Sequence, residues 1–78
     1  MPTVLRSRPY RSYFYSHEPN EPPHIHVEKD NAYAKYWLDS VDYADSYAFR
    51  AKELTQIRKL VEENQQLFLE KWNEFFSK

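Results

Sequence analysis

Residues 21–28 read Glu-Pro-Pro-His-Ile-His-Val-Glu, and this stretch decides the fold that we expect. Two prolines favour an extended backbone, and the residues that follow alternate between polar and apolar side chains. Successive side chains of a β-strand point to opposite faces, so the stretch carries two rows: His24, His26 and Glu28 in one, Ile25 and Val27 in the other. We therefore predict a strand with one titratable face and one apolar face.

Strand patterns also lie on both sides of this stretch. The segments that have them, this stretch included, are residues 3–6, 10–16, 24–29 and 32–38. Pro9 marks a break between the first two, and the turn signal at residues 30–31 makes a hairpin of the last two. His26 and Lys35 then lie on adjacent strands. The sequence leaves the register open, and with it the question of whether these two side chains share a face.

The spacing of apolar residues changes in the second half of the chain. Residues 39–50 are polar and predict a loop, with room for a short strand or a turn of helix. From residue 51 to residue 77 apolar side chains recur at a spacing of three to four, which predicts a helix. Asn64 interrupts this stripe, and we expect two helices with a bend there rather than one long helix. The chain has no glycine, so turns with positive φ are expected at Asn or Asp, such as Asn20, Asp30, Asn31 or Asn64.

These segments predict a single α+β domain over residues 1–78. Residues 1–38 form a small antiparallel sheet of three or four strands, residues 39–50 a loop, and residues 51–77 one or two C-terminal helices packed on one face of the sheet. A chain of 78 residues is enough for one domain and no more.

Composition excludes several kinds of site. Without cysteine the chain has no disulfide and no thiolate metal site, and without glycine it has no phosphate-binding glycine loop. We find no secretory signal and no long apolar stretch, so we expect a cytoplasmic protein that does not enter a membrane. We expect no cofactor.

The histidine row supports three interpretations. His24 and His26 could act as an acid–base pair on a phosphodiester, with Lys35 or Arg11 neutralising the phosphate. They could instead hold a metal ion together with Glu28 or another third ligand, although a His-x-His pair alone is a weak signal. The ordinary alternative is a pair of histidines that are hydrogen-bonded to their neighbours on a sheet face.

Charge is unevenly distributed along the chain, although the net charge is only −1. Residues 1–15 contain three arginines and no acid, whereas residues 39–45 contain three acids and no base. The candidate contacts to a nucleic acid or another phosphate are Arg6, Arg8, Arg11 and Lys35. Ordinary solvated surface charge is the alternative.

Four large aromatic residues lie within nine residues near the C-terminus: Phe68, Trp72, Phe75 and Phe76. They could close the sheet as part of the core. They could also form an interface with a partner protein or with a second copy of the chain, because large aromatics are favoured at interfaces.

Most of the chain resembles a small bacterial family that is catalogued as domain of unknown function 4160. The resemblance lies in residues 1–6, 13–16, 20–28 and 34–38 and in positions spread over 53–76, and the Glu-Pro-Pro-His-Ile-His-Val core is its most specific part. Its characteristic residues, none with an assigned role, are Glu21, Pro22, Pro23, His24, His26, Lys35 and Trp37. Relatives tend to carry glycine near position 8 or 9, where this chain has Arg8-Pro9, which puts the first turn in doubt.

The resemblance implies a stand-alone bacterial protein without an established activity. Such proteins are often encoded beside another small protein, domain of unknown function 2442, and are suspected toxin–antitoxin components. Our first hypothesis is therefore one component of a two-gene toxin–antitoxin-like module that acts through a small cognate protein encoded nearby, with RNA-directed activity at the histidine row as an option. The alternatives are a non-catalytic regulator that binds RNA or DNA, and a small metal-binding protein.

Overall fold

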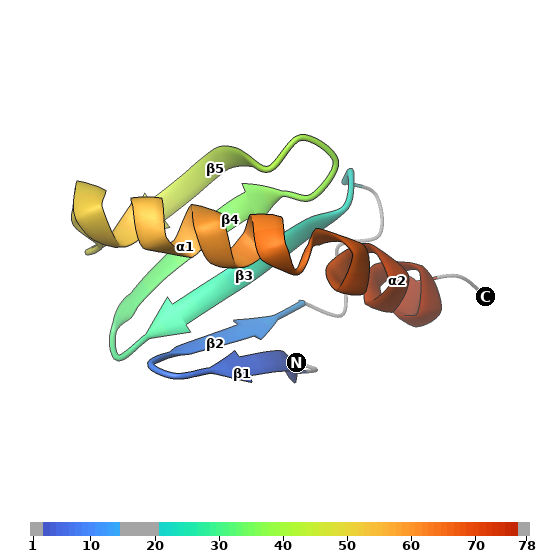
Figure 1. Ribbon diagram of the computed structural model, residues 1–78, viewed down its shortest axis with the longest axis horizontal. Coiled ribbons are helices and arrows are strands. Elements are labelled where there is room, and N and C mark those ends of the chain that lie inside the picture. Colours follow the sequence, from blue (N-terminus) through green and yellow to red (C-terminus); the bar gives the residue numbers. More distant parts are fainter. Residues whose placement is uncertain (1–2, 15–20, 77–78) are drawn as a thin grey trace.

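The computed structural model describes residues 3–14 and 21–76. Five antiparallel strands form one sheet in which each strand pairs with the next along the chain (Figure 1). The strands are β1 (Thr3–Ser7), β2 (Tyr10–Tyr13), β3 (His24–Lys29), β4 (Ala32–Trp37) and β5 (Asp42–Tyr47). Two helices follow, α1 (Ala51–Glu63) and α2 (Gln65–Phe76). The α+β fold predicted from the sequence is confirmed, with one strand more than expected.

The additional strand is β5, which lies in the segment that we expected to be a loop. It pairs with β4 from Tyr33 opposite Tyr47 to Trp37 opposite Asp42, and an irregularity interrupts the register near its middle. A strand at the edge of a sheet buries few side chains, and most of β5 is exposed. The alternation of polar and apolar residues by which a strand is recognised in a sequence is therefore weak here, and the interrupted register weakens it further.

The core lies between the sheet and α1, which crosses one face of the sheet (Figure 1). Ile25 and Val27 are fully buried in it, as the apolar row of β3 predicts. Tyr36 on β4 donates a hydrogen bond from its hydroxyl to the carbonyl oxygen of Leu54, 3.0 Å away, and so ties the sheet to α1. Burial, followed by the neighbouring Tyr43, raises the pKa of Tyr36 above its ordinary value.

The chain bends between the two helices at Asn64. The backbone N–H of Asn64 and its side-chain Nδ2 both donate to the carbonyl oxygen of Leu60, at 3.2 and 2.9 Å. The Asn64 carbonyl in turn accepts the first bond of α2, from the backbone N–H of Phe68. The side chain of Asn64 therefore satisfies the end of α1 rather than the start of α2.

Turns without glycine fall on unexpected residues. Asp30 has the expected positive φ, 55°, but Asn64 does not, with φ of −113°. Val41 and Ala48 have φ of 56° and 65° instead. The first turn, which the resemblance left in doubt, is formed at Arg8-Pro9, whose peptide bond is cis. Asn20 and the last residues of the predicted second strand, 15–16, lie outside the described residues.

Within the described part of the chain, neither helix is long and apolar enough to cross a membrane.

Candidate functional site

The histidine row lies on the face of the sheet opposite the apolar row of β3. The register pairs His26 with Tyr13 on β2 and with Lys35 on β4. Directly paired residues of neighbouring strands project from the same face, so His26 and Lys35 share a face, which the sequence had left open. The structure therefore brings together the three residues that we considered for catalysis, His24, His26 and Lys35.

Both histidines are buried. His24 has no exposed surface and His26 has 6%. The ring of His24 lies 5.7 Å from that of Trp37 and 5.0 Å from that of Trp72 on α2, and the ring of His26 stacks on Tyr13 at 5.4 Å, all measured between ring centres. A general acid or base must come within hydrogen-bond reach of the reacting proton. This packing does not offer the histidines to a substrate.

The Nδ1 atom of His24 lies 2.9 Å from the carbonyl oxygen of Pro22. Because a carbonyl oxygen only accepts, Nδ1 donates this bond and carries a proton. The bond holds the imidazole against the residues that lead into β3. The arrangement is that of a side chain that fixes the start of a strand.

Glu21 connects His24 with Lys35. Its carboxylate oxygen accepts a hydrogen bond from Nζ of Lys35 at 2.6 Å and lies 3.7 Å from Nδ1 of His24. The same ammonium group lies 4.8 Å from the centre of the Trp37 ring, which provides a cation–π contact. The Lys35 side chain is only 17% exposed, so it serves these contacts rather than an incoming phosphate. The sequence suggested no partner for Lys35, because Glu21 precedes the strand and its direction could not be predicted.

Glu28, the third residue of the histidine row, is engaged elsewhere. One of its carboxylate oxygens lies 2.9 Å from Nη1 of Arg11, the residue that faces it on β2. The Arg11 guanidinium also lies 4.8 Å from the centre of the Tyr13 ring. Among residues 3–14 and 21–76, no three His, Asp or Glu side chains are grouped so that they could hold a metal ion.

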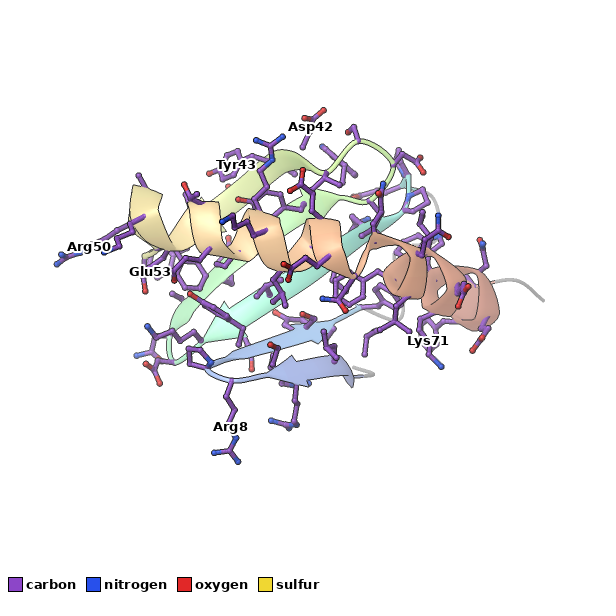
Figure 2. All side chains as sticks on the ribbon, viewed as in Figure 1. Arg8, Asp42, Tyr43, Arg50, Glu53 and Lys71 are labelled. Carbon is purple, nitrogen blue, oxygen red and sulfur yellow. The ribbon has the colours of Figure 1, made fainter. Side chains whose placement is uncertain are left out.

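The three arginines of the first hairpin surround a shallow hollow. Its volume is about 360 Å³, and it is lined by Arg6, Arg8, Pro9, Tyr10 and Arg11. Arg8 extends away from the sheet into solvent (Figure 2). The structure therefore brings together three of the four residues predicted for phosphate binding. Lys35 is separate from them, on β4 and bound to Glu21.

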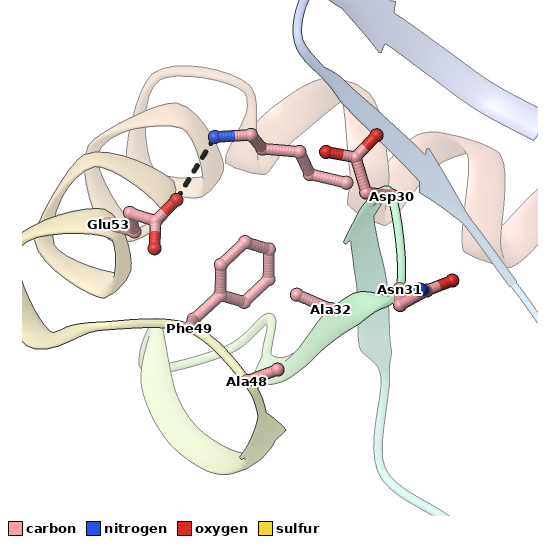
Figure 3. A pocket seen from close by; sticks show the side chains of 7 residues that line it. Asp30, Asn31, Ala32, Ala48, Phe49 and Glu53 are labelled. Atoms are coloured by element: carbon pink, nitrogen blue, oxygen red, sulfur yellow. Dashed lines mark hydrogen bonds and ion pairs between the residues drawn. The ribbon is translucent and has the colours of Figure 1, made fainter.

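A second hollow, of about 270 Å³, lies where the turn between β3 and β4 meets the start of α1 (Figure 3). Lys29 and Glu53 form an ion pair across it at 3.1 Å. A hydrogen bond from the backbone N–H of Arg50 and the bond from Lys29 lower the pKa of the Glu53 carboxyl, whereas Glu53 raises the pKa of Lys29. These contacts join β3 to the first turn of α1, so the hollow is part of the scaffold.

The C-terminal aromatic residues are mostly core. Phe68 and Trp72 are buried within the chain, and the ring of Trp72 packs edge-on against Phe14 at 5.3 Å. Within the chain these two residues therefore belong to the core, and an interface through them stays a prediction. Phe75 and Phe76 are partly buried against the same core. Only their exposed parts can contribute to an interface.

Among the described residues, the most exposed aromatic side chains lie at the β5 edge of the sheet. Tyr43 is 53% exposed and Tyr47 is 62% exposed. Tyr33 on β4 stacks on Tyr47, with ring centres 6.1 Å apart. The sequence predicted a loop here, with room for a short strand, and this surface was not among the predicted sites. The signal was present in the two tyrosines spaced four apart among aspartates, but it does not show which side of a strand they occupy.

A family model described as "Domain of unknown function (DUF4160)" matches residues 10–73. No curated protein and no solved structure matches the chain. The matched segment runs from the start of β2 through most of α2 and so includes the histidine row and β5. It covers well over half of the 78 residues, and the chain therefore belongs to the domain of unknown function 4160 family.

Proposed function

We propose that this chain is a protein-binding module that takes up a strand of a small cognate protein along its free sheet edge, β5. This is the function of one component of a two-gene toxin–antitoxin-like module that works by pairing rather than by catalysis. The observation that carries the proposal is that β5, as the last strand of the sheet order, pairs with β4 alone among the described strands and exposes most of its side chains.

An unpaired sheet edge is a template for another strand. Its outward backbone N–H and C=O groups supply hydrogen bonds, while neighbouring side chains supply specificity. On this edge the stacked pair of Tyr33 and Tyr47 forms an exposed aromatic surface beside the backbone. Tyrosine buries a large area at a small cost in conformational entropy, so such a pair is suited to anchor a partner.

The charge of β5 points to the kind of strand that would bind. Asp42 and Asp45 are exposed on β5, Asp39 precedes it, and residues 39–49 contain no Lys or Arg. Two copies of β5 placed side by side would bring aspartates together, which disfavours self-pairing. A strand that carries Lys or Arg would gain attraction instead. We therefore propose that β5 binds a basic strand of the cognate protein.

The histidine row fits a supporting role within this function. His24 and His26 are buried, and Lys35 is bound to Glu21. These contacts hold the start of β3, the middle of β4 and the inner side of α2 in place. The row thus fixes the strands against which β5 is built, and the proposal requires no chemistry from it.

The test uses the cognate small protein that the family resemblance leads us to expect beside this gene, and measures its affinity for the chain by calorimetry. The variant Asp42→Lys/Tyr47→Lys adds three positive charges along β5 and removes the exposed aromatic anchor. We expect at least a tenfold rise in Kd, about 1.4 kcal/mol or more. The control Glu62→Lys/Gln66→Lys makes the same change in charge at exposed helical positions and should leave the Kd nearly unchanged.

Thermal unfolding of both variants confirms that they are folded. No binding by the unmodified chain, or equal weakening by the two double variants, would contradict the proposal. Binding that weakens steeply with added salt for the unmodified chain supports the basic character of the partner strand.

A further inference from the structure

We propose that the hairpin of β1 and β2 carries a second binding site, for the phosphate groups of a nucleic-acid strand. The site is the hollow lined by Arg6, Arg8 and Arg11 together with Pro9 and Tyr10. It lies at the sheet edge opposite β5 and is independent of the protein-binding function proposed above.

Two of the three arginines carry charge that no described residue balances. Arg6 and Arg8 are exposed, and neither forms an ion pair with any residue that the structure describes. The Arg11 guanidinium is held by Glu28 and by the Tyr13 ring and so forms a fixed wall of the hollow. A guanidinium remains charged at every physiological pH and can donate two parallel hydrogen bonds to a phosphate. Arg6 and Arg8 are therefore the groups that would contact the ligand.

The aspartates of β5 do not cancel the positive electrostatic potential around these arginines. β1 and β5 are separated by four strand spacings, about 19 Å, which is about twice the screening length of 8–10 Å at physiological ionic strength. Figure 2 shows Arg8 and Asp42 on opposite sides of the molecule. A chain with a net charge of −1 thus presents a locally basic surface to a polyanion.

The shape of the hollow favours a strand of nucleic acid over an enclosed small ligand. The hollow lies on an anchored hairpin, because the Tyr10 ring packs edge-on against Phe49 at 6.2 Å and the Tyr10 hydroxyl donates to Oε1 of Gln56. Its rim consists of exposed residues, Arg6, Arg8 and Pro9. The lining contains no amide or carboxylate side chain of the kinds that recognise adenine or cytosine, and its arginines are the groups assigned to phosphate. We therefore expect binding through the backbone, without preference for sequence.

The experiment measures binding of a short fluorescein-labelled oligothymidylate to the full chain by fluorescence anisotropy, at several salt concentrations. The variant Arg6→Ala/Arg8→Ala should weaken binding at least tenfold. Its slope of log affinity against log salt should be smaller by roughly 1.4, the value for two lost contacts to a single strand. The control Arg50→Ala/Arg58→Ala removes two exposed arginines at and within α1 and should change the affinity less than twofold.

Each other outcome overturns the proposal. If the unmodified chain does not bind at low salt, the proposal is wrong. Equal weakening by the two double variants would also contradict it, because the attraction would then come from any basic residue. Pyrophosphate, titrated by calorimetry, separates the two sources of phosphate. If pyrophosphate binds and the oligonucleotide does not, the hollow accepts free phosphate compounds and the nucleic-acid assignment is wrong. Arg6→Ala/Arg8→Ala should still bind the cognate protein through β5, so the two proposals fail separately.

Discussion

At the scale of single residues, His24 shows how a side chain typical of catalysis can serve the structure. Its ring is enclosed by Trp37, Trp72 and His26, and its Nδ1 is bound to the carbonyl of Pro22. Removing the ring leaves a cavity between β3, β4 and α2. The burial of His24 therefore leads to a prediction about stability rather than about activity.

We expect His24→Ala to lower the free energy of unfolding by about 2–4 kcal/mol, the range for loss of a large buried side chain. Urea unfolding followed by circular dichroism measures this change. Tyr43→Ala is the control, since Tyr43 is more than half exposed, and it should cost clearly less. If His24→Ala were as stable as the unmodified chain yet abolished an effect of expression on bacterial growth, His24 would be a catalytic residue and the structural role would be wrong.

Ala48 occupies a turn position that would favour glycine, in a chain that contains no glycine. Its φ of 65° lies in the left-handed region, where a Cβ atom costs roughly 1–2 kcal/mol. Ala48→Gly removes that cost and should raise the free energy of unfolding by about 0.5–1 kcal/mol, after allowance for the greater freedom of glycine in the unfolded chain.

The matched change Ala32→Gly lies in β4, where the backbone has no positive φ. It should destabilise the chain by about 0.5–1 kcal/mol. Thermal or urea unfolding measures both variants, and we expect the free energy of unfolding to rise for Ala48→Gly and to fall for Ala32→Gly. Destabilisation by both changes would show that Ala48 is not strained.

At the scale of elements, the ion pair of Lys29 and Glu53 links β3 to the first turn of α1. The pKa of Glu53 is lowered by the backbone N–H of Arg50 and by Lys29. A carboxyl with a lowered pKa in the folded state contributes stability above its ordinary pKa of 4.5, and this contribution is lost as the pH falls through the lower, folded value.

We therefore expect stability to fall as the pH drops below about 4.5, with Glu53 as one source of the change. Glu53→Gln should lose less stability than the unmodified chain over this acid range. The measurement is urea unfolding at a series of acidic pH values. The control is Glu62→Gln, an exposed position later on the same helix, and a pH profile of Glu53→Gln identical to that of the unmodified chain would contradict the role of the pair.

The sequence predicted the inner elements better than the outer ones. β3 alternates polar and apolar residues because its apolar row enters the core, and β4 likewise buries Ala34 and Tyr36, while the break at Asn64 interrupts a clear apolar stripe. β5 was expected only as a short strand for which the predicted loop had room, because an edge strand buries little and its register is interrupted. The arginines were found by charge alone. The burial of His24 could not be predicted from the sequence. It depends on the direction that α2 takes after the bend and on Trp72, 48 residues away in the sequence.

At the scale of the whole molecule, the fold separates two surfaces of opposite charge. The meander places the β1–β2 hairpin with its arginines and β5 with its aspartates at the two edges of one sheet, while α1 and the inner side of α2 cover the core. The histidine row lies between these edges and stabilises the strands that separate them. The molecule is in this account a rigid two-sided binding protein, with one edge for a basic strand and the other for phosphate.

The most direct test of this proposal is amide hydrogen exchange of the chain, alone and saturated with the cognate small protein that we propose as its partner. Strand addition would form new backbone hydrogen bonds along one element, so our account predicts slower exchange in residues 42–47 and unchanged exchange in residues 3–7. Binding that leaves the amides of residues 42–47 unchanged, or that protects residues 3–7 instead, would contradict the assignment of β5 as the partner-binding edge.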